Sequence, residues 1–254
     1  MFFESSLPDF DMRTPWLTWP NKTSAQVESI TSNGITATVT IVEDGVKSNI
    51  ECEKVLVAVG VQGNIEGMGL ENIGIETENG FISADENMET NVPNIYAIGD
   101  VTGKMLLAHV ASAQAVTVVE YLAGLEPPQL DYSLMPRAIY CKPQVASFGL
   151  TEKQALEQGI QVRVGKFPFA ASGKALALDE TEGIVKLIVD EEIGEIIGVH
   201  MIGSEVTELL GEVSIAKMLE GTSTELGWLV HPHPTISEML KEAALDTMGE
   251  AIHI

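Results

Sequence analysis

The chain has 254 residues, of which 45% are hydrophobic, and a formal net charge of −23. This hydrophobic content is ordinary for a globular protein with a packed core. The acidity argues against a nucleic-acid partner and against anionic membrane surfaces, because both attract basic side chains. We interpret it as a surface that favours solubility.

The sequence contains no signal for a membrane span, for secretion or for a disulfide framework. It has no run of about 18 apolar residues, and its first residues lack the basic region and long apolar core of a secretion signal. The two cysteines, Cys52 and Cys141, are far apart, as in proteins of a reducing compartment. A cytoplasmic protein is therefore expected.

The first part of the chain predicts an irregular leader followed by β-structure. Residues 1–22 hold three prolines and two tryptophans and show no regular pattern. Residues 26–30 alternate and residues 35–42 are rich in β-branched side chains, with a hairpin turn at 43–46. The continuous apolar run 54–60 predicts a strand that is buried on both faces.

The middle of the chain predicts a small hairpin, a strand and a helix. Residues 61–93 are interpreted as a linker that contains a hairpin with its turn at 78–81. An apolar strand is predicted from 94 to a Gly-Asp turn at Asp100. Apolar side chains then recur at helical spacing over 105–123, and two prolines that follow mark a boundary.

Residues 131–254 predict a separate α+β domain. A short acidic turn between two of its strands indicates an antiparallel sheet. The helix predicted over 204–219 is apolar on so wide an arc that one side would face the sheet and another a partner subunit. The strands are predicted at 137–140, 145–150, 162–169, 184–189 and 196–202.

The most informative motif is residues 231–238, which read His-Pro-His-Pro-Thr-Ile-Ser-Glu. The prolines hold His233 in a rigid loop ahead of a helix, five residues before Glu238. An imidazole beside a carboxylate is a common construction for a proton-transfer base. The spacing of Thr235 and Glu238 is equally that of a capping box, in which Glu238 would be structural.

Three segments together resemble one enzyme family. The strand ending in Gly99-Asp100, the helix start at 105–109 and the His-x-His-Pro-Thr-x-x-Glu motif occur in the order found in the flavin-dependent pyridine nucleotide–disulfide oxidoreductases. The chain most resembles the dihydrolipoyl dehydrogenases of that family, over roughly residues 23–254. The expected fold is α+β/α/β, with an antiparallel sheet in the last domain.

The resemblance also implies a domain order. Residues 1–22 have no counterpart in it. The implied parts are a C-terminal remnant of the NAD-binding domain at 23–60, a flavin-facing central segment at 61–130 and a dimerisation domain at 131–254.

For the catalytic pair, the resemblance implies that His233 takes a proton from the substrate thiol and that Glu238 orients it. In this family the base acts on the flavin and disulfide of the opposite subunit, so a homodimer through 131–254 is expected. A lipoyl-bearing complex is the implied partner, and a metal site is not expected.

For the cofactors, the resemblance implies that Asp100 accepts a hydrogen bond from the ribityl chain of FAD and that the backbone of Ala108 contacts the flavin. The matching positions for NAD are Val27 and Gly60. An aspartate at a strand-terminal turn, a valine in a strand and a glycine at a strand end are also explained without any ligand.

The family's Gly-x-Gly-x-x-Gly loops and Cys-x-x-x-x-Cys redox pair do not occur in this sequence. The chain therefore resembles the C-terminal half of such an enzyme. It is expected not to retain FAD and to be inactive alone, with an N-terminal half or a full-length relative as a further partner. The alternative is a catalytically dead dimerisation or interaction module.

Overall fold

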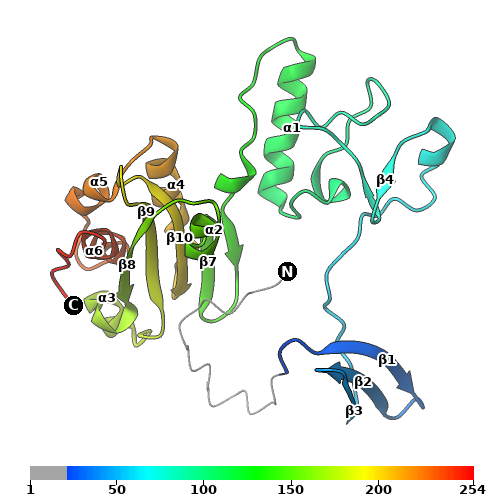
Figure 1. Cartoon of the computed structure of the whole chain (residues 1–254), viewed down its shortest axis with the longest axis horizontal. Coiled ribbons are helices and arrows are strands. Elements are labelled where there is room, and N and C mark those ends of the chain that lie inside the picture. The colour runs from blue at the N-terminus through cyan, green and yellow to red at the C-terminus, as the bar shows by residue number, and fades with distance from the viewer. Residues whose placement is uncertain (1–21) are drawn as a thin grey trace. The chain divides into compact units, whose positions relative to one another are not determined.

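The computed structural model describes residues 22–254, so all of the predicted leader except Lys22 lies outside the described residues. The chain divides into two compact units, Met1–Gln62 and Gly63–Ile254 (Figure 1). The predicted mixed α and β composition with antiparallel sheets is confirmed.

The first unit contains a three-stranded antiparallel sheet in the order β1-β2-β3. The strands are β1 (Gln26–Ser32), β2 (Ala37–Glu43) and β3 (Val46–Cys52). The predicted hairpin turn is confirmed between β2 and β3, where Asp44 and Gly45 both have positive φ. Within the three strands only Ala37 and Ile41 of β2 are buried, so the sheet has a small core.

The predicted buried strand at 54–60 is wrong. The structure has no strand there, and Leu56 and Val59 are 91% and 88% exposed. A strand buried on both faces needs neighbouring strands for its backbone groups and packed layers above and below. The sheet β1-β2-β3 does not pair with this segment, so its apolar sequence has nothing to pack into.

The second unit begins with short elements around a small core. The predicted hairpin is confirmed as β4 (Thr77–Glu78) and β5 (Phe81–Ile82). The other elements here are the 3₁₀ helices η1 (Leu70–Ile73) and η2 (Gly99–Thr102) and the helix α1 (Ala108–Leu122). The helix predicted over 105–123 is thus confirmed, with a start three residues later.

The predicted strand at 94–100 is also wrong. Only Tyr96 makes a β contact, an isolated bridge to Glu89, and the chain then turns into η2. Ile95 and Ala97 are apolar because they pack in the small core with Ile75 and Ile82. Apolar side chains in a short segment do not distinguish a strand from a packed loop.

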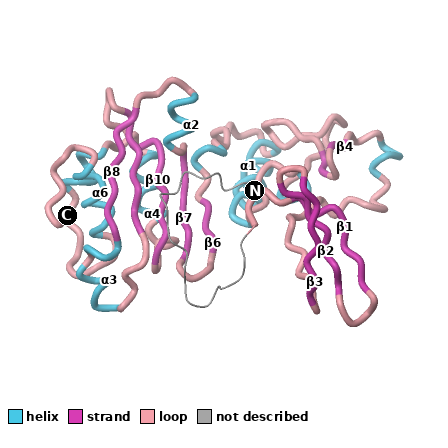
Figure 2. The backbone as a smooth tube through the Cα atoms, turned by 60° about the horizontal axis from the view of Figure 1, so that its bottom comes forward, coloured by secondary structure: helices cyan, strands magenta, loops and turns pink. Residues whose placement is uncertain are grey.

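The rest of the second unit is built on a five-stranded antiparallel sheet in the order β6-β7-β10-β9-β8 (Figure 2). All five predicted strands are present and the predicted antiparallel arrangement is confirmed. Their bounds are β6 (Arg137–Ile139), β7 (Gln144–Gly149), β8 (Val162–Pro168), β9 (Ile184–Asp190) and β10 (Ile196–Gly203).

Helices cover both faces of this sheet. Val185, Leu187 and Val189 of β9 lie in the main core with residues of the C-terminal helices, whereas Lys186 faces the other way and pairs with Glu152 of α2. The elements are η3 (Tyr132–Leu134), α2 (Glu152–Glu157), η4 (Phe169–Ala171), α3 (Gly173–Leu178), α4 (Leu210–Met218), α5 (Ser223–Trp228) and α6 (Glu238–Asp246).

The helix predicted over 204–219 is shorter in the structure, because α4 starts only at Leu210. Residues 204–209 form turns that begin at Glu205, whose φ of 59° is incompatible with a right-handed helix. Val206 and Leu209 still pack in the main core, which explains the apolar pattern. Among residues 22–254, no helix is long and apolar enough to span a bilayer.

Strand β8 and helix α6 pack closely at Gly165. A methyl group on Gly165 would lie 1.9 Å from the carbonyl oxygen of Ala243 in α6. The backbone N–H of Lys166 also donates to Asp246 Oδ2 at 2.7 Å. Glycine is therefore required at this position of β8, and the contact sets where α6 lies.

We predict that Gly165→Ala lowers the free energy of unfolding by about 1–3 kcal/mol, because α6 must move away from the sheet. Gly211→Ala is the control: it lies in α4 with no atom within 4 Å of the new methyl group, and it should stabilise the protein by about 0.5–1 kcal/mol. Urea unfolding measures both. Equal effects of the two variants would contradict the prediction.

Candidate functional site

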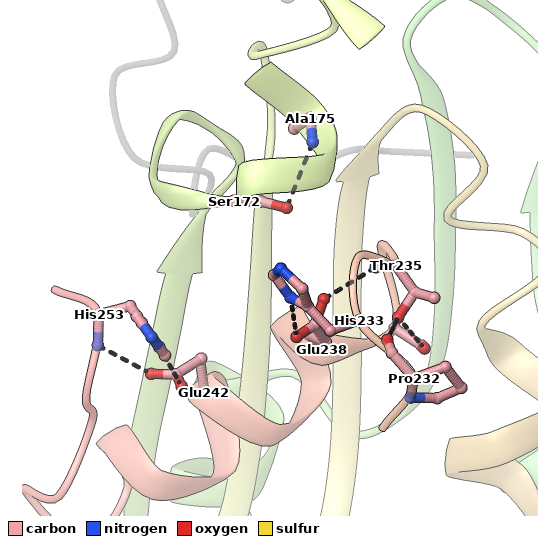
Figure 3. Close-up of polar contacts among 9 residues, drawn as sticks. Ser172, Ala175, Pro232, His233, Thr235, Glu238, Glu242 and His253 are labelled. Carbon is pink, nitrogen blue, oxygen red and sulfur yellow. Dashed lines mark hydrogen bonds and ion pairs between the residues drawn. The ribbon is translucent and has the colours of Figure 1, made fainter. Parts of the chain in front are cut away.

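The loop between α5 and α6 presents His233 to solvent. Its side chain is 78% exposed, and its Nδ1 lies 3.0 Å from Oε1 of Glu238 (Figure 3). Glu238 is the first residue of α6, so the packing of that helix on β8 fixes the carboxylate. The structure brings together the two residues that the sequence singles out. Their role in proton transfer stays a prediction.

The second oxygen of Glu238 serves the helix start. Its Oε2 accepts the backbone N–H of Thr235 at 2.8 Å, as in a capping box. The reciprocal bond of a capping box is not made: α6 begins at Glu238 with Ser237 as its N-cap, and the Thr235 hydroxyl donates to the carbonyl of Pro232 at 2.7 Å. The contacts with Thr235 and His233 use different oxygens of Glu238, so one carboxylate makes both.

Electrostatics keep Glu238 ionised. Burial alone would raise the pKa of this carboxyl, but hydrogen bonds from the Thr235 N–H and from His233 outweigh burial and lower it. An ionised carboxylate can only accept, so Nδ1 of His233 carries a proton. Nε2 has no hydrogen-bond partner among residues 22–254 and is therefore free to exchange a proton with a bound molecule.

His231, two residues earlier, lies inside. Its side chain is 3% exposed and its Nε2 lies 2.7 Å from Oε1 of Glu212 in α4. Sequence reasoning did not find Glu212, which is 19 residues away on another helix. A contact between separate elements leaves no local pattern in the sequence.

Asp100 and the start of α1 lie close together in the fold. Gly99 has a φ of 76°, and a methyl group there would lie 3.2 Å from Cβ of Ala111 in the first turn of α1. The turn that carries Asp100 therefore packs on the start of this helix. The Asp100 side chain is exposed and has no hydrogen-bond partner in the described part of the chain.

The N-terminus of α1 is open. Its N-cap is Leu107, which has no side-chain cap, and no acidic residue lies in the first turn. Ala108 is exposed at this end. Unpaired N–H groups and the positive end of the helix dipole favour an anionic group at this end; the flavin contacts of Asp100 and Ala108 stay predictions. The sequence lacks the glycine-rich loop for a pyrophosphate.

Gln114 holds this turn and was not found from the sequence. It is fully buried in α1; its Oε1 accepts the Gly99 N–H at 2.6 Å, and its Nε2 donates to the Tyr132 hydroxyl at 2.8 Å. The partners of Gln114 lie on other elements, so nothing in the local sequence marks this residue.

The two positions matched to NAD lie in the first unit. Val27 is in β1 beside an irregularity of the pairing with β2. Gly60 has a φ of 112° and lies in the exposed segment after β3. No hydrogen bond joins them, and their role in binding NAD stays a prediction. No group of three or more potential metal ligands occurs within residues 22–254.

Two family models match the chain. Residues 21–115 match the pyridine nucleotide-disulphide oxidoreductase model, and residues 135–244 match the dimerisation domain of the same family. The second match covers the five-stranded sheet and both His231 and His233.

Curated relatives agree with this match. The dihydrolipoyl dehydrogenase of Bacillus subtilis is 51% identical over 211 residues, which are 83% of this chain and 44% of the relative. That of Mycobacterium leprae is 47% identical over 233 residues, 91% of this chain and 50% of the relative. The chain spans about half the length of the curated relatives it matches.

Solved structures show the same fold. LpdA from Mycobacterium tuberculosis superposes with a TM-score of 0.78 at 26% identity, over 87% of this chain and 48% of that one. The HOCl-induced flavoprotein disulfide reductase RclA from Escherichia coli gives 0.77 at 25% identity, over 86% and 50%. The chain belongs to the pyridine nucleotide-disulphide oxidoreductase family, and the relatives that it matches in part are dihydrolipoyl dehydrogenases.

Proposed function

We propose that this chain supplies the proton-transfer pair and the dimer interface of a dihydrolipoyl dehydrogenase, which converts dihydrolipoamide and NAD to lipoamide and NADH. The observation that carries the proposal is the 3.0 Å contact of His233 Nδ1 with Glu238 inside the region that matches the family's dimerisation domain, which leaves Nε2 exposed and without a partner in the described residues.

In this proposal His233 takes the proton of the substrate thiol at Nε2. The carboxylate of Glu238 stabilises the imidazolium that forms and holds the ring in one orientation. The low pKa of Glu238 suits this role, because a carboxyl that stays ionised accepts from Nδ1 at neutral pH. The thiolate left on the substrate is the better nucleophile.

The cofactors would meet other residues. Asp100 and the backbone of Ala108 would contact FAD, and Val27 and Gly60 would lie near NAD. When bound, FAD carries electrons from the dithiol to NAD. The lipoyl group would be presented by a lipoyl-bearing complex in the cytoplasm.

Activity would need residues that this sequence does not contain. It has no Cys-x-x-x-x-Cys pair, and its two cysteines, Cys52 and Cys141, belong to different compact units. The same observation favours a second candidate, a catalytically dead dimerisation or interaction module that binds full-length relatives. The partner of the active form would be an N-terminal half or such a relative.

We predict that the purified chain is colourless and does not reduce lipoamide, because contacts at one end of a flavin do not offset the entropy lost on binding. Activity should return when a flavin-bearing N-terminal half of a relative is added, and His233→Ala should not restore it. A yellow preparation with stoichiometric FAD would contradict the first expectation. Equal activity with His233→Ala would contradict the role of the base.

We predict that the chain is a homodimer through residues 131–254. Ile215, Met218 and Leu219 form an exposed apolar surface at the end of α4, and a permanent interface buries on the order of 2,000 Å². Ile215→Glu should give a monomer in light scattering. Leu156→Glu, at an exposed apolar position of α2 on the other face of the sheet, should leave the dimer intact. A wild-type monomer at micromolar concentration would refute the prediction.

We predict that His233→Ala raises the pKa of Glu238, because the variant removes one of the hydrogen bonds that lower it. His253 and Glu242 make a similar pair on α6, with Nδ1 at 2.8 Å from Oε1. His253→Ala is therefore the matched control: it should raise the pKa of Glu242, which burial raises but His253 and backbone N–H groups lower, and leave that of Glu238 unchanged.

Carboxyl carbon NMR titrations measure both groups. The part of the stability that comes from the low pKa of Glu238 is present above the ordinary glutamate pKa and is lost as pH falls through the folded pKa. His233→Ala should therefore reduce the fall in the free energy of unfolding that accompanies acidification. If Glu238 titrates alike in wild type and His233→Ala, Glu238 serves only as a cap.

A further inference from the structure

The loop that carries His233 has one polar tie to the rest of the domain. Its other hydrogen bonds stay within the loop or join it to the start of α6, as between Thr235 and Glu238. Among the described residues, the hydrogen bond that joins residues 230–237 to any other part of the domain is the 2.7 Å contact between His231 and Glu212. Ile236 also packs in the main core, and the His231–Glu212 pair is the polar contact that joins the loop to α4.

The two histidines of the loop lie on opposite sides of it. His231 is 3% exposed and His233 is 78% exposed, and the prolines at 232 and 234 restrict the backbone around them. Fixing His231 inside thus fixes His233 outside.

Packing alone does not explain a polar pair here. Nδ1 of His231 is buried and has no partner in the described part of the chain. An unpaired buried polar atom is unfavourable, and an apolar pair of the same shape would avoid it. What the carboxylate adds is a directed contact: the ring that donates from Nε2 to Glu212 has one position and one orientation.

We infer that Glu212 is a positioning residue for the His233–Glu238 pair and acts through His231. The inference rests on the proposed function of that pair. Ile215 and Leu219 follow Glu212 by three and seven residues and lie on the same side of the helix. Glu212, which holds the loop that carries His233, therefore lies beside the apolar surface proposed for the dimer interface.

The test compares Glu212→Ala with Glu212→Gln, whose amide can still bond to His231. The control is Glu208→Ala, which removes the same charge from an exposed site just before α4. The first measurement is hydrogen exchange at the Thr235 N–H, which bonds to Glu238. The second is the change in the Glu238 pKa that His233→Ala causes in each background. Global stability is measured in parallel.

We expect Glu212→Ala to speed exchange at Thr235 about tenfold and to reduce the response of Glu238 to His233→Ala. Glu212→Gln and Glu208→Ala should keep both near wild type. If Glu212→Ala does not fold, His231→Phe replaces it, because it keeps a buried ring and removes both nitrogens.

Unchanged exchange at Thr235 in a folded Glu212→Ala or His231→Phe protein would overturn the inference. The same would follow if Glu208→Ala matched Glu212→Ala, since the effect would then be one of charge alone. The exchange measurement does not depend on catalysis. Faster exchange at Thr235 together with failed reconstitution of activity would support the anchor and count against the proposed function.

Discussion

The contact between β8 and α6 is the constraint on which the site depends. The helix approaches the strand so closely that Gly165 has no space for a side chain against Ala243. Because Glu238 begins this helix, the backbone contact fixes where the carboxylate lies. The exposed ring of His233 takes its orientation from that carboxylate. A solvent-facing group is thus held by a buried interface, which keeps its geometry stable without covering it.

Two glutamates of α6 make the same kind of contact with a histidine and with backbone N–H groups. Glu238 and Glu242 lie one turn apart, and each uses one oxygen for a histidine Nδ1 and the other for backbone N–H groups. The first pair belongs to a loop that also reaches α4. The second joins α6 to His253, near the last described residue. The shared geometry shows that a His–Glu contact alone does not identify a catalytic base, and that its surroundings must be considered.

The sequence predicted the five-stranded sheet well because its longer strands are short apolar runs bounded by turn residues. The strand at 54–60 could not be excluded in this way, since its burial depends on neighbours that the fold does not provide. The strand prediction for residues 94–100 was wrong for a related reason. Ile95 and Ala97 are apolar because they pack in the small core from a loop. At the site, His233 and Glu238 are close in sequence and were found. Glu212 and Gln114 act across elements, and nothing local marks them.

The hydrogen bonds of Gln114 run in one direction. The Gly99 N–H donates to Gln114, Gln114 donates to Tyr132, and the Tyr132 hydroxyl lies 4.0 Å from the sulfur of Met88, to which it donates weakly. Donors aligned in series polarise one another. The amide just before Asp100 therefore points inward and is unavailable to a ligand. A molecule at this turn would meet the carboxylate oxygens of Asp100 and the uncapped N–H groups at the start of α1, but not the N–H of Gly99.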